Sequence, residues 1–213
     1  HHQADLPAKS GLGSSSAFTV GLVNALSGLN GEIRNKRQLA LDAINIEQNL
    51  IGENVGSQDQ TAVAFGGLNR IDFGGAQEIS VQPIMLGSNR LELFQDHLML
   101  FFTGLSRDAS KIAKEQIKNI SNKNKELKLM HELVNEGAGI LTNNKRNLDE
   151  FGKLLDTGWK IKRQLSSKIT NPYLDNLYET GIRAGALGGK LLGAGGGGFI
   201  LFFARPEDQL KIK

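Results

Sequence analysis

Cysteine is absent from the 213 residues of the sequence, and tryptophan, tyrosine, methionine and proline are scarce. Without cysteine the chain has no disulfide framework, no thiolate metal ligand and no cysteine nucleophile. The absence fits a reducing compartment, and we expect the protein to be cytoplasmic. No apolar run approaches the roughly 20 residues of a membrane-spanning helix, and no signal peptide is visible, so we expect no membrane partner.

The sequence also has no large excess of positive or negative charge, since its formal net charge is only +3. No dense basic patch with interleaved aromatic residues is present, so we expect no nucleic-acid partner. A hydrophobic fraction of 39% with 22% charged residues is typical of a globular protein with a sizeable core. An acidic small substrate, such as a nucleotide or a sugar phosphate, needs only local positive charge.

Glycine is unusually frequent, with 26 copies that gather in clusters rather than spreading along the chain. Two clusters stand out, one at Gly11 and Gly13 and the other in the stretch 188–199. Clustered glycine marks places where the backbone approaches another group closely or adopts a positive φ.

The spacing of apolar residues predicts a mixed α and β chain with two lobes that meet near 87–89. The second predicted helix should carry Leu39, Ala43, Ile46 and Leu50 on one stripe. The run 97–104 is continuously apolar, which is typical of a strand covered on both faces. The predicted helices cover 14–27, 35–50, a segment that begins at 59–61, 107–122, 124–139, 147–165, 172–187 and a last one from Pro206. The predicted strands are 68–73 and 77–84, paired across Gly74 and Gly75, then 97–104 and two strands within 188–204.

The two ends of the sequence look interrupted. The first glycine loop should follow a strand, but few residues precede it, and the last helix runs to the final residue. We therefore expect the sequence to be part of a longer chain.

The stretch GLGSSS at 11–16 leads directly into an apolar helix pattern. The first N–H groups of a helix lack internal acceptors and carry the positive end of the helix dipole. Glycines there let an anion approach, and the serine hydroxyls can bind phosphate oxygens or a metal ion, so the stretch predicts a phosphate cradle. A capped helix after a tight turn is the alternative. The stretch is neither a Walker A loop nor a dinucleotide fingerprint, because no GK[ST] closes it and Ser16 stands where the third glycine would be.

Two carboxylates stand out in 46–60, one on each side of a polar loop, and a carboxylate can bind a metal ion or accept a proton. Glu47 lies near the end of the second predicted helix, and Asp59 follows a polar, glycine-containing loop. Glu53 is an alternative metal ligand. A solvated helix face for Glu47 and a helix cap for Asp59 are the alternative interpretations.

The second glycine stretch, LLGAGGGGFILFF at 191–203, contains four consecutive glycines. Such a run loses conformational entropy on folding, and a tight hairpin needs only one or two glycines. The run 195–198 therefore indicates a place that requires bare backbone, and a simple hairpin turn is the alternative.

The stretch PAKSGLGSSSA at 7–17 resembles the nucleotide-binding motif P-x-x-x-G-L-G-S-S-A-A of the GHMP kinases, with Ser16 as the one departure. The glycine stretch near 195 resembles the third motif of the same superfamily. The resemblance implies an α+β two-lobe fold, with an incomplete N-terminal lobe (1–88) like ribosomal protein S5 domain 2 and a ferredoxin-like C-terminal lobe (89–213). It also implies ATP and Mg²⁺ as cofactors.

The resemblance carries specific roles onto this sequence. Asp59 would accept or stabilise the proton of the acceptor hydroxyl, and Glu47 would bind Mg²⁺ together with Ser14 or Ser15. The nucleotide-binding residues would be Pro7, Lys9, Ser10, Gly11, Leu12, Gly13, Ser14, Ser15 and Ser16. The substrate-binding residues would be Gln58, Arg107, Gly195, Gly196 and Gly197, with a weaker case for Gln60.

Over nearly its whole length the chain is similar to the heptose 7-phosphate kinases, although their usual N-terminal segment is absent. That similarity implies transfer of the γ-phosphoryl of ATP to the anomeric hydroxyl of a heptose 7-phosphate, for surface polysaccharide precursors. Other sugar-1-kinases, a mevalonate-branch decarboxylase and a non-catalytic nucleotide- or sugar-binding protein remain alternatives, and the oligomeric state stays open. Candidate contacts for the 7-phosphate are Arg107, Lys162, Arg163, Ser106 and Ser110.

Overall fold

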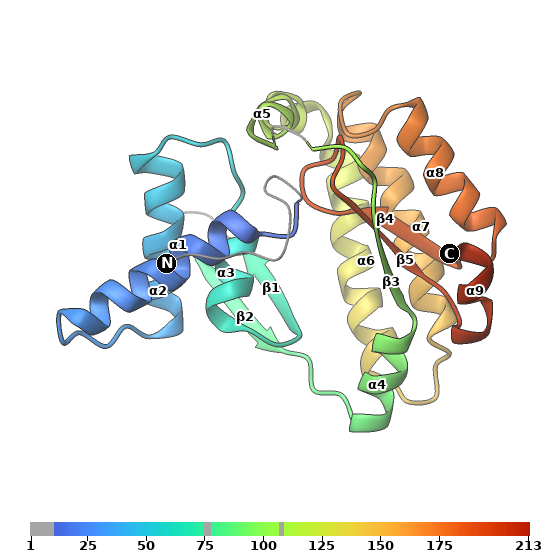
Figure 1. Ribbon diagram of the computed structural model, residues 1–213, viewed down its shortest axis with the longest axis horizontal. Helices are drawn as coiled ribbons and strands as arrows, with labels where there is room; N and C mark the ends of the chain where they lie inside the picture. The colour runs from blue at the N-terminus through green and yellow to red at the C-terminus, as the bar shows by residue number, and fades with distance from the viewer. Residues whose placement is uncertain (1–10, 75–77, 107–108) are drawn as a thin grey trace.

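The computed structural model describes residues 11–74, 78–106 and 109–213. Figure 1 shows the elements in two groups. The first lobe comprises the helices α1, α2 and α3 and the hairpin β1–β2. The second lobe comprises the helices α4 to α9 around a three-stranded sheet. The chain is therefore an α+β protein, as the sequence predicts.

The first lobe packs its helices against one another and places a hairpin beside them. α1 and α2 share a small apolar core formed by Val20, Leu39 and Ala43. β1 and β2 pair antiparallel, and Ile71 stands opposite Val81. The predicted hairpin and the helices α1 and α3 are thus confirmed. The elements are α1 (Ser14–Leu29), α2 (Lys36–Asn45), η1 (Ile46–Leu50), α3 (Gln58–Phe65), β1 (Asn69–Phe73) and β2 (Ile79–Pro83).

The second predicted helix does not continue as a regular α-helix. α2 begins with a capping box formed by Asn35 and Gln38, and it passes at Ile46 into a π turn, η1. The Ile51 amide donates to the Ile46 carbonyl over 2.8 Å, which is the i→i+5 pattern of a π-helix. The extra residue in the turn shifts the helix phase, so the predicted stripe is wrong at its end: Leu50 is 73% exposed.

The second lobe is built on the antiparallel sheet β3–β5–β4. One core cluster surrounds Trp159 and Phe202, and a second surrounds Phe203. The predicted helices and strands of this lobe are confirmed within a few residues. The elements are α4 (Ser88–Asp96), β3 (Leu98–Phe102), α5 (Ala109–Asn119), η2 (Ile120–Asn122), α6 (Asn124–Thr142), α7 (Asp149–Lys162), η3 (Arg163–Leu165), α8 (Pro172–Arg183), β4 (Gly188–Leu191), β5 (Phe199–Phe203), η4 (Pro206–Asp208) and α9 (Gln209–Ile212).

Strand β3 is not covered on both faces, which corrects the prediction from its apolar run. Met99 is buried and Phe101 packs against the core cluster around Trp159. Leu100 and Phe102 on the other face are 54% and 45% exposed. Among the described residues β3 pairs only with β5, so it is an edge strand, and the helices cover it unevenly.

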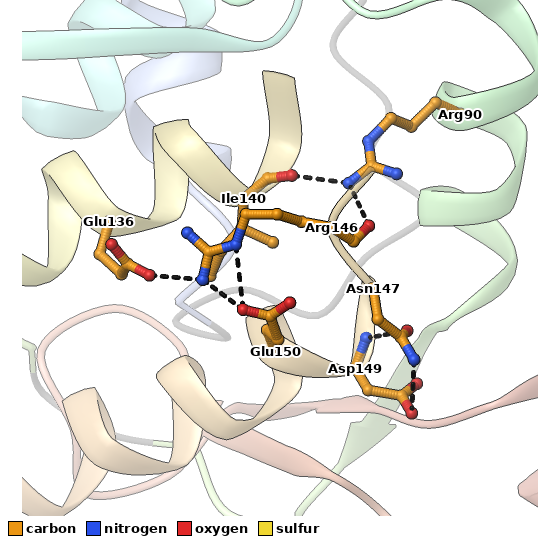
Figure 2. A network of polar contacts seen from close by, with 7 residues as sticks. All are labelled: Arg90, Glu136, Ile140, Arg146, Asn147, Asp149 and Glu150. Atoms are coloured by element: carbon orange, nitrogen blue, oxygen red, sulfur yellow. Dashed lines mark hydrogen bonds and ion pairs between the residues drawn. The ribbon is translucent and has the colours of Figure 1, made fainter. Parts of the chain in front are cut away.

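The junction between α6 and α7 is fixed by two arginines (Figure 2). Arg90, on α4, donates to the Ile140 carbonyl over 2.6 Å and to the Arg146 carbonyl over 3.1 Å. Arg146 bonds to Glu136 over 2.6 Å and pairs with Glu150. These bonds satisfy the Ile140 carbonyl at the end of α6 and tie α6 to α4 and to the first turn of α7.

Among the described residues, hydrogen bonds at Ser110 and at Arg70 join the two lobes. The Asn54 amide and side chain both donate to the Ser110 hydroxyl of α5. The Arg70 guanidinium of β1 donates to the Asn135 side chain of α6 over 2.8 Å.

Within the described ranges, no helix has the length and apolar character that crossing a bilayer requires.

Candidate active site

Helix α1 begins at Ser14, and the residue that precedes it, Gly13, provides no side chain to cap it. Gly11 and Gly13 both have positive φ, at 81° and 72°, and Gly13 occupies the cap position. Because the cap residue is glycine, no cap side chain accepts a hydrogen bond from the N–H groups of the first turn. That turn also contains no acidic residue. The leading N–H groups therefore remain available to an anionic ligand, with the helix dipole behind them.

Asp59 faces this helix mouth from the first turn of α3. A Cβ built on Gly13 would lie 3.4 Å from the Asp59 Cβ and Cγ atoms and 3.6 Å from Oδ2. The Asp59 side chain thus lies close to the glycine loop, although the two positions are 46 apart in the sequence. This arrangement places a potential proton acceptor directly beside a potential phosphate cradle.

Glu47 is buried between α1 and α3, with only 2% of its surface exposed. It projects from the π turn η1, a helix irregularity that often occurs at functional sites. The Ser16 hydroxyl donates to Glu47 Oε2 over 3.0 Å, and the Gln60 side-chain amide donates to the same oxygen. The three side chains link α1, η1 and α3 beside the helix mouth.

Two oxygens of this cluster have no hydrogen-bond partner, namely Glu47 Oε1 and Gln60 Oε1. A buried carboxylate bonded only to neutral donors keeps an uncompensated charge, which favours a bound cation. Oxygen ligands suit Mg²⁺, which usually takes one or two carboxylates and completes its shell with waters and phosphate oxygens. In the part of the chain that the structure describes, no group of three His, Cys, Asp or Glu side chains could hold a metal ion by itself. The residues present therefore fit a magnesium ion.

The second glycine stretch forms a turn between β4 and β5 in which Gly195 to Gly198 all have positive φ. The Gly196 amide donates to the Ile169 carbonyl and the Gly198 amide to the Leu105 carbonyl, both over 2.8 Å. The Thr103 amide and hydroxyl both donate to the Gly198 carbonyl, again over 2.8 Å. The turn thus has a conformation that only glycine adopts readily, and its neighbours hold it in place.

Replacing Gly195 with alanine should lower the free energy of unfolding by at least about 2 kcal/mol, because strain and crowding act together. Its φ is 111°, and an added Cβ would lie 2.7 Å from the Ile169 carbonyl oxygen. Gly28→Ala, in helix α1 with no atom within 4 Å of the added Cβ, is the matched control and should not destabilise. Urea denaturation of both variants measures the difference. Equal stabilities would show that the turn tolerates a side chain.

Two family models match this chain. The model described as "GHMP kinases N terminal domain" matches residues 1–67, and the one described as "GHMP kinases C terminal" matches residues 130–213. Together they span more than half of the sequence. The chain belongs to the GHMP kinases.

Individual relatives of this GHMP kinase chain include sugar kinases. It is 30% identical over its full length to a D-glycero-alpha-D-manno-heptose 7-phosphate kinase of Campylobacter jejuni, of which it covers 62%. It is 27% identical over 98% of its length to a bifunctional fucokinase/GDP-fucose pyrophosphorylase of Arabidopsis thaliana, of which it covers 20%. A crystal structure of a D-glycero-D-manno-heptose 1-phosphate kinase from Bacteroides thetaiotaomicron matches 98% of the chain at 25% identity with a TM-score of 0.71, and the chain covers 57% of it. The GHMP kinase fold predicted from the sequence is thereby confirmed.

The GHMP kinase motif residues fall partly outside the described part of the chain. Pro7, Lys9, Ser10 and Arg107 lie outside the described residues. Gly11, Leu12 and Gly13 form the approach to α1, and Ser14 and Ser15 lie in its first turn. Ser16, rather than Ser14 or Ser15, bonds to Glu47. Gln58 is exposed at the first residue of α3, and Glu53, the alternative metal ligand, is also exposed.

Other candidate contacts of the GHMP kinase chain have hydrogen-bond or ion-pair partners elsewhere in the structure. Lys162 donates to the Gly193 carbonyl, and Arg163 pairs with Asp175 over 3.4 Å. The Ser110 hydroxyl accepts from Asn54. Gln116, which sequence reasoning missed, donates to the Ala194 carbonyl over 2.6 Å and so helps to hold the glycine turn. Such bonds between side chain and backbone leave no pattern in the sequence.

Proposed function

We propose that the chain carries the phosphoryl-transfer site of an ATP-dependent sugar kinase. The position of the Asp59 side chain close to Gly13, where an added Cβ would touch it, is the observation that supports this function best. A phosphate at the mouth of α1 would be bound by backbone N–H groups, and an acceptor hydroxyl between that phosphate and Asp59 would be within reach of the carboxylate. Glu47, in the turn η1, lies beside the same helix mouth and accepts a hydrogen bond from Ser16 of α1.

The residues divide the work of the reaction. The glycine loop and the first turn of α1 hold the nucleotide phosphates in place. Asp59 accepts the proton of the acceptor hydroxyl as its oxygen bonds to the γ-phosphorus. The bond from that phosphorus to the β,γ-bridging oxygen breaks, and ADP leaves with its electrons.

Glu47 and Ser16 would hold the metal ion on the phosphate side of the site. When bound, Mg²⁺ neutralises charge on the phosphate oxygens. Gln60 fixes the Glu47 carboxylate through its amide and leaves its own oxygen free for a metal-bound water. The glycine turn at 195–198 belongs to the substrate side of the site in this proposal, with Gln58 and Arg107.

The substrate we propose is a heptose 7-phosphate, phosphorylated on its anomeric hydroxyl to the 1,7-bisphosphate. The 30% identity to the Campylobacter heptose 7-phosphate kinase over the whole chain supports this choice. The 27% identity to the Arabidopsis fucokinase supports the second candidate, another sugar-1-kinase. The chain covers 62% of the first relative, so the assay should use the complete protein to which these residues belong.

ADP release in the presence of different sugars decides between the two candidates. D-glycero-D-manno-heptose 7-phosphate, the corresponding heptose 1-phosphate, L-fucose and galactose would each be offered with ATP and Mg²⁺. The proposal expects the highest kcat/KM for the 7-phosphate. A preference for fucose or galactose would favour the second candidate, and no release with any sugar would favour a binding protein or a decarboxylase.

Glu47→Gln should weaken Mn²⁺ binding in the presence of ATP by at least about 10-fold, because the charged ligand of the ion is lost. The same change should not lower the melting temperature of the metal-free protein, since it removes an uncompensated buried charge. Electron paramagnetic resonance titration of Mn²⁺ and a thermal melt in chelator measure the two effects.

Glu53→Gln is the matched control, because Glu53 is an exposed carboxylate in the adjoining loop. We expect its Mn²⁺ affinity to equal that of the unmodified protein. Loss of Mn²⁺ binding in the Glu53 variant with retention in the Glu47 variant would move the metal site to the loop.

A further inference from the structure

A pocket of about 360 Å³ lies where β1 of the first lobe faces the helices α6 and α7 of the second. Its volume is within the range of small-molecule sites. Most of its walls are apolar, and small residues of the two helices, Gly137, Ala138 and Gly158, form part of its lining. Neither Gly13, Glu47 nor Asp59 lines it, so it is separate from the candidate active site.

Lys190 is one of the cationic residues that line this mostly apolar pocket. It comes from the short strand β4 and lines the pocket with its partly buried side chain. Within the described part of the chain, its ammonium group forms no hydrogen bond or ion pair, and burial lowers the pKa of Lys190. An ammonium group that is removed from water without a counter-ion is unfavourable, so the position favours an anionic partner.

The other polar groups around the pocket differ from Lys190 in their bonding. Arg70 pairs with Asp72 over 2.9 Å and donates to Asn135, and Lys162 donates to the Gly193 carbonyl. The indole Nε1 of Trp159, whose side chain also lines the pocket, is buried without an acceptor. Lys190 is thus the cation there without a partner among the described residues.

We propose that this pocket binds a small organic anion with an apolar body, whose charged group pairs with Lys190. The apolar walls match a hydrocarbon or aromatic body and do not match a sugar, which needs hydrogen-bonding partners on most sides. A ligand held there contacts β1 as well as α6 and α7, and it therefore bridges the two lobes.

Octanoate, which joins one carboxylate to an unbranched apolar chain, is a suitable probe, with 1-octanol as its uncharged counterpart. Calorimetric titration should show saturable binding of octanoate, tighter than that of 1-octanol by at least about 10-fold. Lys190→Met should abolish that difference, because it should weaken the binding of octanoate and leave the binding of 1-octanol unchanged. Lys160→Met, which removes an exposed α7 lysine paired with Asp156, should leave both affinities unchanged. Equal octanoate affinities for the Lys190 variant and the unmodified protein, or no saturable binding, would overturn the proposal.

Chemical labelling of the unmodified protein gives a second test that does not depend on how a variant folds. Acetic anhydride acetylates uncharged amines, and mass spectrometry can follow Lys190 and Lys160 in one sample. Saturating octanoate should slow acetylation of Lys190 by at least about 10-fold and leave Lys160 unaffected. An unchanged rate at Lys190 in protein shown to bind octanoate would place the anion elsewhere.

Discussion

Asp59→Asn is expected to lower turnover by at least about 100-fold, because the acceptor hydroxyl loses its proton acceptor. Asparagine has nearly the same size, so residue 59 should keep its place close to Gly13 and ATP should bind as before. A coupled assay of ADP release gives the turnover number, and calorimetric titration gives the ATP affinity. The expected signature is a change in kcat with little change in nucleotide binding.

Asp42→Asn serves as the control for this experiment. Asp42 is an aspartate of α2 that pairs with Arg34, and its side chain is 37% exposed. The change should leave turnover unaffected. If Asp59→Asn retains near-normal turnover, Asp59 has no part in the chemistry.

Gly13→Val should reduce the affinity for ATP by at least about 100-fold while the protein remains folded. Gly13 has a φ of 72°, a region that β-branched residues rarely adopt. Its added Cβ would also lie 3.4 Å from Asp59, in the space that a bound phosphate needs. Fluorescence titration with a labelled ATP analogue measures the affinity, and circular dichroism checks the fold.

The chain offers a closely matched control in Gly31→Val. Gly31 has a φ of 74°, at the other end of α1, and no atom lies within 4 Å of its added Cβ. The variant therefore reproduces the backbone strain of Gly13→Val without blocking the helix mouth. Equal loss of ATP affinity in both variants would indicate general destabilisation and would contradict a phosphate site at Gly13.

Local patterns were sufficient to predict most elements of this fold. The hairpin β1–β2 and the strands on both sides of the glycine turn follow from apolar runs interrupted by glycine. The π turn at 46–50 could not be predicted, because its residues continue a helical pattern and the extra residue carries no signal. The apolar run of β3 is likewise compatible with a strand that is covered on one face or on both. Which of the two occurs depends on elements that are distant in the sequence.

The candidate site was predictable where its residues lie in local sequence motifs. The glycine loop and Asp59 belong to short motifs, so the sequence alone identifies them as candidates. The bonds that Ser16 and Gln60 make to Glu47 join residues 31 and 13 positions apart from it, and only the folded chain brings them together. The partners of Lys162 and Arg163 likewise became apparent only in three dimensions.

The π turn bears on how chain length can vary among relatives. Deleting one residue between Ile46 and Leu50 would restore ordinary α-helical hydrogen bonding and rotate whatever follows. The polar segment 51–57, which lies outside any helix or strand, can absorb an insertion with less disturbance. When homologous sequences are aligned, gaps therefore belong in 51–57, and a relative that truly lacks a residue within 46–50 should direct its carboxylate differently.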